Sequence, residues 1–202
     1  DKERERGLIT ASAGNHAQGV AYAAQRYGVP ATIVMPATTP YIKVERTKAL
    51  GAEVVLAGDV YDDAYARAIE IAEERGLTFV HPFNDLGVAT GQGTITMEIV
   101  QELPLVDCIL VPIGGGGLAT GASTLAKLLN PHIKVIGVDP AGAACMKASL
   151  EAGHVVKLPH VSTIADGTAV QEPGDKIFPY LQRNLDGIIT VEDEELIVAF
   201  LD

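Results

Sequence analysis

Four consecutive glycines, Gly114 to Gly117, follow the apolar run at 106–113 and precede a helical pattern that ends near Asn130. A near-continuous apolar run is typical of a central parallel strand that is covered on both faces. Glycines after such a strand let the backbone approach a ligand, and the next helix N-terminus presents N–H groups to an anion. Each glycine loses much conformational entropy on folding, so a purely structural turn rarely keeps four. The pattern predicts a phosphate-binding loop in an α/β fold. No Lys-Ser or Lys-Thr pair follows, which excludes a nucleoside-triphosphate P-loop.

A second strand-to-helix turn lies at residues 12–19, with the sequence SAGNHAQG. It follows a short strand predicted over 8–10 and opens a helix predicted over 15–27. The free N–H groups at the start of that helix favour an anion such as a carboxylate. The alternative is a plain cap, in which Ser12 or Asn15 satisfies those groups. The residues alone leave both interpretations open.

Strands and helices are predicted to alternate along the whole chain, which indicates an α/β fold with parallel sheets. Further strands are expected at 31–35, 53–56, 77–80, 134–139 and 187–191, and further helices at 40–50, 62–75, 94–103, 143–152, 175–184 and from 192 onward. The polar, glycine-rich segment 84–93 is predicted to be a boundary loop. The sequence thus predicts two parallel-sheet units.

Composition excludes several classes of partner. The 202 residues contain 15 Lys and Arg against 26 Asp and Glu, a formal charge of −11. Nucleic acids and anionic membranes require clustered cations, so neither is expected to bind. No apolar run reaches membrane-spanning length, and there is no signal-peptide pattern. Cys108 and Cys145 lie in apolar surroundings without metal-site spacing and are predicted to be reduced core residues of a cytoplasmic protein.

A dinucleotide site is the main rival interpretation of the glycine run. Gly114-x-Gly116-x-x-Ala119 fits a relaxed Rossmann fingerprint, and Asp139 follows Gly116 at about the distance in sequence of a ribose-binding acid. This would make the chain a domain of an NAD-dependent oxidoreductase. Four glycines satisfy many patterns, however, and the rival gives no role to the turn at 12–19.

Four motifs in a fixed order carry a family resemblance: SAGNHAQG at 12–19, GQGT at 91–94, PIGGGGLATG at 112–121 and STIADGTAV at 162–170. Together they resemble the pyridoxal-phosphate enzymes of the tryptophan-synthase β-subunit type, in particular the threonine dehydratases (threonine ammonia-lyases). The resemblance implies the fold-type II architecture, with a small mobile domain over 7–84 and part of the large cofactor-binding domain over 85–202. Both chain ends are abrupt, so the chain is expected to be an internal piece, truncated at both ends, of a longer protein. The alternative is a short natural domain.

The resemblance also assigns roles to individual residues. Asn15 would hydrogen-bond the 3′-hydroxyl of pyridoxal 5′-phosphate, and Gly167 would lie beside its ring. The cofactor phosphate would be held by Gly114, Gly115, Gly116, Gly117 and the N–H of Leu118. The substrate carboxylate would be held in the turn formed by Ser12, Ala13, Gly14 and His16. The implied reaction is elimination of water from L-threonine or L-serine, which yields a 2-oxo acid and ammonia. The resemblance further implies a homo-oligomer, a dimer or tetramer.

Two departures from the family pattern limit what the chain alone is expected to do. The family's Schiff-base lysine lies in a Ser-Phe-Lys-x-Arg-Gly type motif before the first turn, and no such motif is present. The isolated chain is therefore predicted to be inactive, because it lacks the nucleophile that attaches the cofactor. All eight lysines are expected to be solvated on the surface: Lys2, Lys43, Lys48, Lys127, Lys134, Lys147, Lys157 and Lys176.

The related serine racemases differ at two further positions. They carry a second serine where this chain has Ala13, and alanine cannot transfer a proton, so racemisation is not expected. Asp139 could represent one carboxylate of their divalent-metal site, but Cys145 stands where a second acid is expected. No strong metal site is therefore predicted. A non-catalytic α/β assembly domain remains a third alternative.

Overall fold

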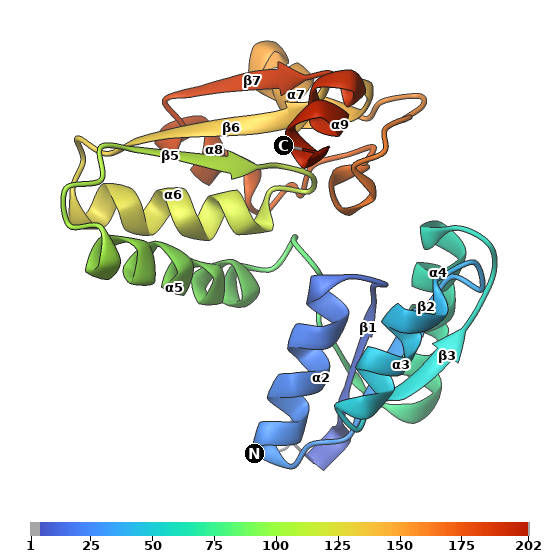
Figure 1. Ribbon diagram of the computed structural model, residues 1–202. Helices are drawn as coiled ribbons and strands as arrows, with labels where there is room; N and C mark the ends of the chain where they lie inside the picture. Colours follow the sequence, from blue (N-terminus) through green and yellow to red (C-terminus); the bar gives the residue numbers. More distant parts are fainter. Residues whose placement is uncertain (1–4, 202) are drawn as a thin grey trace. The chain divides into compact units, whose positions relative to one another are not determined.

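The computed structural model describes residues 5–201, and the chain divides between Pro82 and Phe83 into two compact units (Figure 1). Each unit is a parallel α/β structure, as the alternation of elements predicts. The observed boundary lies two residues before the predicted boundary at 84/85. Among the described residues, no helix is long and apolar enough to cross a membrane.

The described elements of the first unit are β1 (Leu8–Ala11), α2 (Asn15–Tyr27), β2 (Ala31–Met35), α3 (Tyr41–Ala49), β3 (Glu53–Leu56), α4 (Tyr61–Arg75) and β4 (Thr78–Phe79). The strands form a four-stranded sheet in the order β3-β2-β1-β4, in which every neighbouring pair is parallel. One face of the sheet packs against α2 and α3 through Val20, Ala21 and Val44, and the other packs against α4 through Ala68 and Ile71.

The described elements of the second unit are α5 (Leu86–Glu102), β5 (Cys108–Pro112), α6 (Gly117–Leu129), β6 (Lys134–Pro140), a 3-10 turn (Ala141–Ala143), α7 (Cys145–Ala152), a second 3-10 turn (Asp166–Thr168), α8 (Phe178–Asn184), β7 (Gly187–Val191) and α9 (Asp193–Leu201). The strands form a three-stranded parallel sheet in the order β5-β6-β7. The core joins one face of the sheet to α6, α7 and α8, and α5 packs on α6 (Figure 1).

The prediction that 106–113 forms a central strand covered on both faces is wrong for the described chain. β5 is an edge strand, and its residues alternate between exposed and buried. Ile109 and Val111 face the core, whereas Leu110 is 63% exposed on the other face. Cys108 shares that exposed face, so its assignment to the core is also wrong, while Cys145 is buried. Side chains alternate along any strand, and the described elements cover only one face of this sheet.

The boundary loop predicted at 84–93 is largely helical instead. α5 begins at Leu86 rather than Thr94, and the Asp85 carboxylate caps it by accepting the N–H of Val88 at 3.0 Å. Glycines in this segment resemble loop signals, but they are compatible with a helix here. A Cβ at Gly93 would make only ordinary contact with α6, at 3.4 Å from the carbonyl oxygen of Gly121, whereas a Cβ at Gly121 would lie 2.7 Å from the Gly93 nitrogen.

Smaller boundary differences occur at three other helices. α3 begins at Tyr41, with Pro40 at its N-cap position and no side-chain cap. α7 begins at Cys145, after a 3-10 turn, and α8 begins at Phe178 rather than Asp175. These differences of one to three residues are usual for helix ends, where short 3-10 turns are common.

Candidate functional site

The glycine loop is enclosed by protein on the side where side chains would project. Cβ atoms at Gly115 and Gly117 would collide with Phe83, the latter at 2.7 Å from its Cα. Gly116 has φ +99°, a conformation that favours glycine, and a Cβ there would lie 2.6 Å from Ile177 Cδ1. A Cβ at Gly114 would lie 3.0 Å from Thr168 Cα. A side chain is therefore disfavoured at all four positions, at Gly115 and Gly117 by the same residue, Phe83.

The same loop carries a row of unpartnered backbone donors. Among the described residues, the N–H groups from Gly114 to Ala119 have no hydrogen-bond partner, and the first one satisfied is that of Thr120, which donates to the carbonyl of Gly116 at 2.9 Å. Gly115, Gly116 and Gly117 are buried. Buried backbone N–H groups are almost always paired, so a group of them at a helix N-terminus fits an anionic ligand. The residues present thus fit the phosphate of a bound cofactor.

The segment 162–168 lies beside the glycine loop, since Thr168 contacts Gly114. Ser162 donates its N–H to the carbonyl of Gly142 at 2.9 Å, and a Cβ at Gly142 would collide with Ser162. The structure therefore brings Gly167, in the exposed 3-10 turn at Asp166–Thr168, into the neighbourhood of the loop.

Asp193 anchors this segment from the first turn of α9. Its carboxylate accepts the Thr163 hydroxyl at 2.6 Å and the Ile164 N–H at 3.1 Å. This role of Asp193 is not visible in the sequence, because the helix dipole already explains an acidic residue at the start of a helix. Only the spatial proximity of two segments thirty residues apart shows that the side chain holds a loop.

In the first unit, the turn before α2 is open rather than capped by a side chain. The N-cap residue is Gly14, and no side chain caps the helix, which excludes both Ser12 and Asn15 as the cap. The Ser12 hydroxyl instead accepts the N–H of Gly14 at 3.2 Å. Within the described chain, the N–H groups of Asn15, His16 and Ala17 have no partner. Asn15 is exposed, and Ser12 and Ala13 are half-buried. The turn offers free donors.

His16 points back into its own unit instead of offering a cation. Its Nε2 lies 3.1 Å from both the Thr10 hydroxyl and the Val80 carbonyl oxygen. A carbonyl can only accept, so Nε2 carries the proton. Burial lowers the pKa of the imidazole, although the bond to Val80 partly opposes this. His16 is therefore a neutral side chain that ties the turn to the strand ends, and it does not supply positive charge to a carboxylate.

Asp139 and Cys145 are both buried where β6 meets α7. One Asp139 oxygen accepts the N–H of Lys147 at 3.0 Å, and the other has no partner. Burial raises the pKa of Asp139 to about 6 and that of Cys145 to about 12, the latter with a contribution from the Asp139 charge. Asp139 is 1% exposed, which does not suit a ribose-binding acid. Among the described residues, no three His, Cys, Asp or Glu side chains form a group that could hold a metal.

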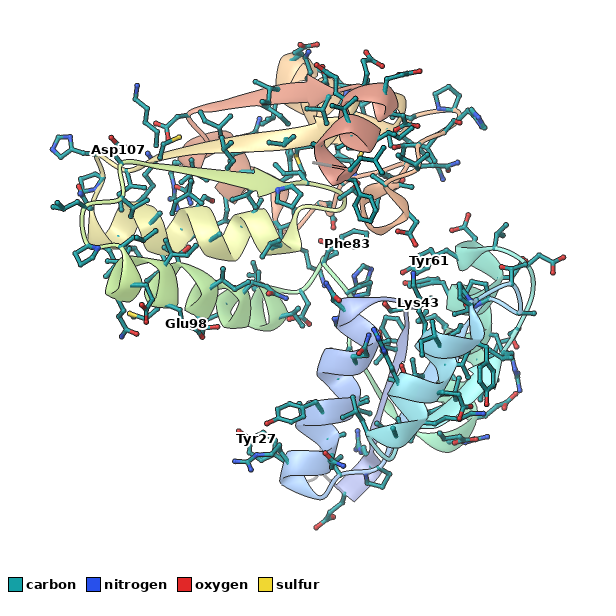
Figure 2. All side chains as sticks on the ribbon, viewed as in Figure 1. Tyr27, Lys43, Tyr61, Phe83, Glu98 and Asp107 are labelled. Atoms are coloured by element: carbon teal, nitrogen blue, oxygen red, sulfur yellow. The ribbon has the colours of Figure 1, made fainter. Side chains whose placement is uncertain are left out.

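Phe83, labelled in Figure 2, contacts the glycine loop, and Asn84 binds a segment beside that loop. Sequence reasoning missed both residues. Neither residue belongs to a periodic pattern, and the only sequence signal is one aromatic residue at the start of a polar segment.

None of the seven described lysines is buried, but Lys43, Lys127 and Lys147 are half-buried. The prediction that all the lysines are solvated on the surface therefore holds only in part for the described residues. Lys2 lies outside the described residues.

The two groups of predicted site residues belong to different units. Gly114, Gly115, Gly116, Gly117, Leu118 and Gly167 lie in the second unit, where the structure brings them together. Ser12, Ala13, Gly14, Asn15 and His16 form the turn of the first unit. Each group has free backbone donors at a helix N-terminus.

Comparisons with known proteins show which family the chain resembles in sequence. A family model described as pyridoxal-phosphate dependent enzyme matches residues 1–202. The chain is 49% identical over 201 residues to an L-threonine ammonia-lyase of Thermotoga maritima, which covers 100% of this chain and 50% of that protein. It is 52% identical over 201 residues to the L-threonine dehydratase biosynthetic IlvA of Burkholderia multivorans, covering 98% of this chain and 40% of that protein. The chain thus spans about half the length of the curated relatives it matches.

Solved structures show the same fold. The processed form of threonine deaminase isoform 2 from Solanum lycopersicum superposes with a TM-score of 0.90 at 49% identity, over 95% of this chain and 56% of that one. Maize serine racemase superposes with a TM-score of 0.93 at 36% identity, over 100% of this chain and 61% of that one. The predicted fold-type II architecture is confirmed. The chain belongs to the family of pyridoxal-phosphate-dependent enzymes, as the glycine loop, the two parallel sheets and the family match over residues 1–202 together show.

Proposed function

We propose that the protein containing this chain is an L-threonine ammonia-lyase that uses pyridoxal 5′-phosphate. It removes water from L-threonine, or from L-serine, and a second water hydrolyses the resulting enamine to a 2-oxo acid and ammonia. The observation that carries the proposal is the row of unpartnered N–H groups from Gly114 to Ala119, which fits the cofactor phosphate. The reaction and substrate are supported by relatives that are named as threonine ammonia-lyases and dehydratases.

The second unit would hold the cofactor. The N–H groups of the glycine loop and Leu118 would donate to the phosphate, and the N-terminus of α6 would add its dipole. Gly167 lies in the exposed turn beside the loop and would leave room for the ring. When bound, the cofactor supplies an electron sink for the pair left at the substrate's α-carbon, while the protein supplies orientation and electrostatics.

The first unit would hold the substrate. The free N–H groups at the start of α2 and the Ser12 hydroxyl would donate to the carboxylate, while Asn15 would bind the 3′-hydroxyl of the cofactor ring. Ala13 would line the same turn. His16 would keep the turn in place through Thr10 and Val80, because its neutral ring is held inside the unit. We assign the small mobile domain, expected over 7–84, to the first unit, which ends at Pro82, and part of the large cofactor domain, expected over 85–202, to the second unit.

Two other activities fit less well. A nicotinamide-dependent oxidoreductase would need an accessible acid after β6, but Asp139 is buried and accepts a backbone N–H. A racemase would need an acid–base group on the opposite ring face, and Ala13 offers none. A serine racemase is nevertheless among the similar structures, so D-serine formation should be measured together with elimination.

The proposal is tested on the full-length protein. Asn15→Ala is expected to lower kcat/KM for L-threonine by about 10- to 100-fold, the range for losing a hydrogen bond to a charged or strongly polarised group. The matched control is Gln25→Ala, an exposed amide at the other end of α2, which should leave kcat/KM unchanged. The assay follows 2-oxobutanoate formation with saturating cofactor, and the unfolding midpoint of each variant is recorded.

Normal kinetics in Asn15→Ala would overturn the site assignment, and oxidation of a substrate with NAD would favour the rival. Borohydride reduction of the full-length holoenzyme followed by peptide mapping should label a lysine outside residues 1–202. A labelled lysine within this chain would disprove our inference that the chain carries the cradle but not the attachment residue.

The free cysteines agree with a reducing, cytoplasmic setting, and the family resemblance favours a homo-oligomer.

A further inference from the structure

At the start of the second unit, three consecutive side chains each contact a different part of that unit. Phe83 contacts the glycine loop, Asn84 binds the segment 174–176, and Asp85 caps α5. They follow directly on Pro82, the last residue of the first unit. The first residues of the second unit are therefore anchored within that unit.

Phe83 occupies the space that side chains of the glycine loop would take. A Cβ at Gly115 would collide with the Phe83 ring, and a Cβ at Gly117 would lie 2.7 Å from Phe83 Cα and 3.0 Å from its carbonyl oxygen. The loop backbone thus lies directly on the ring and the main chain of one residue. Since interiors pack densely, removing the ring would leave a void beside the loop.

Asn84 connects a third segment to the same place. Its amide oxygen accepts the N–H of Lys176 at 2.9 Å, and its amide nitrogen donates to Asp175 at 2.7 Å. A Cβ at Gly174 would lie 2.7 Å from Asn84 Oδ1. Gly174 in turn donates its N–H to the carbonyl of Gly115 at 3.0 Å. Asn84 therefore reaches the glycine loop through one intervening residue.

We propose that Phe83 and Asn84 are positioning residues for the phosphate cradle. Phe83 fixes the path of the backbone at Gly115 and Gly117, and Asn84 fixes the segment that satisfies the Gly115 carbonyl. With that carbonyl held by Gly174, the N–H of Gly116 on the opposite side of the same peptide stays free for the phosphate. The inference rests on the proposed function for the phosphate itself, but it concerns residues to which that proposal gives no role.

The test separates the phosphate from the rest of the cofactor. Apo full-length enzyme is titrated with pyridoxal 5′-phosphate and with pyridoxal. The readout is the Kd for pyridoxal divided by the Kd for pyridoxal 5′-phosphate, which measures how much the phosphate adds to binding. In Phe83→Ala this ratio is expected to fall by about tenfold or more, the effect of one weakened charge-assisted hydrogen bond, while Kd for pyridoxal changes little. Asn84→Ala should lower the ratio in the same direction. Inorganic phosphate should compete less well with the phosphorylated cofactor in both variants.

Three further variants distinguish a loss of positioning from general destabilisation. Ile133→Ala, a buried residue before β6, should lower the unfolding midpoint without changing the Kd ratio. Phe83→Leu keeps most of the packing volume and should retain most of the ratio. Gly115→Ala should weaken phosphate-dependent binding in the presence of Phe83, and the loss should be smaller in Phe83→Ala, where space for the Cβ exists.

The outcomes separate this inference from the proposed function. A Kd ratio in folded Phe83→Ala and Asn84→Ala equal to that of the wild type would overturn the positioning role and leave the proposed function standing. Equal affinity of the wild-type enzyme for pyridoxal and pyridoxal 5′-phosphate would instead overturn the phosphate cradle, and with it the proposed function. A change of the same size in Ile133→Ala would show that the ratio reports only stability.

Discussion

Asp139 shows at the scale of a single residue what burial does to a charge. The side chain is 1% exposed, and one of its oxygens has no partner. Burial raises its pKa to about 6 despite the backbone hydrogen bonds from α7 that favour the charged form. In an unfolded chain an aspartate titrates near 4, so between about pH 4 and pH 6 the folded state binds more protons. Stability is therefore expected to fall as pH rises through this window.

Asp139→Asn should remove this pH dependence. The amide keeps the shape and can still accept the N–H of Lys147, but it carries no charge. The variant is expected to be more stable than the wild type at pH 7.5, by at most about 3 kcal/mol, with the difference vanishing near pH 4. Urea unfolding of the full-length protein at several pH values measures it, with exposed Asp107→Asn as the control. A variant that is less stable at pH 7.5 would mean that the carboxylate has a favourable partner.

Among the elements, the pair α5 and α6 depends most on close backbone contact. A Cβ at Gly121 in α6 would collide with the carbonyl oxygen of Ala89 in α5, and it would lie 2.7 Å from the backbone nitrogen of Gly93. Thr96 of α5 donates its hydroxyl to the carbonyl of Ala122 at 3.0 Å. Glycine in mid-helix lowers helix stability, and here the close approach of two helices compensates for it.

Two glycine-to-alanine changes in these helices should have opposite signs. Gly121→Ala forces the helices apart and is expected to destabilise the protein by about 1–3 kcal/mol or more, as overpacking does. Gly91→Ala in α5 meets nothing within 4 Å and should stabilise the protein by about 0.5–1 kcal/mol through helix propensity. Thermal unfolding of the full-length variants measures both. Equal effects would show that the helices do not cross as closely as the structure has them.

On the scale of the whole molecule, one face of the β5-β6-β7 sheet is uncovered by the described chain. Leu110 is 63% exposed and pairs in register with Ile136, and Ile189 is 47% exposed and pairs with Val138. A continuous apolar face of this kind usually contacts another element or another chain. The chain spans about half the length of its curated relatives, and a protein of that length has further chain with which to cover the face.

Charged substitutions on this face should act differently in two contexts. Leu110→Lys with Ile189→Lys is expected to reduce self-association of residues 1–202 expressed alone, measured by sedimentation and dye binding. In the full-length protein, the same pair should lower stability by about 2 kcal/mol or more, because it would bury unpaired charge. Leu105→Lys, at a side chain that is 96% exposed, is the control for both measurements. No loss in the full-length protein would show that the face stays in water there.

The sequence by itself determined the elements and the type of site. Periodicity and glycine or proline punctuation placed most strands and helices, because these signals act within a few residues. The glycine run indicated a phosphate loop. The four ordered motifs indicated the family, which the family match over residues 1–202 confirms. Such features are local, or they depend only on order along the chain.

Only the tertiary structure decided which neighbours give each residue its role. It turned His16 inward, exposed Cys108 at a sheet edge, extended α5 to Leu86, and brought Phe83 against the glycine loop. Asp193 likewise holds a loop thirty residues away. Burial, pKa and close backbone contact depend on groups that are distant in sequence and meet only when the chain is packed. No pattern within a short window of the sequence contains that information.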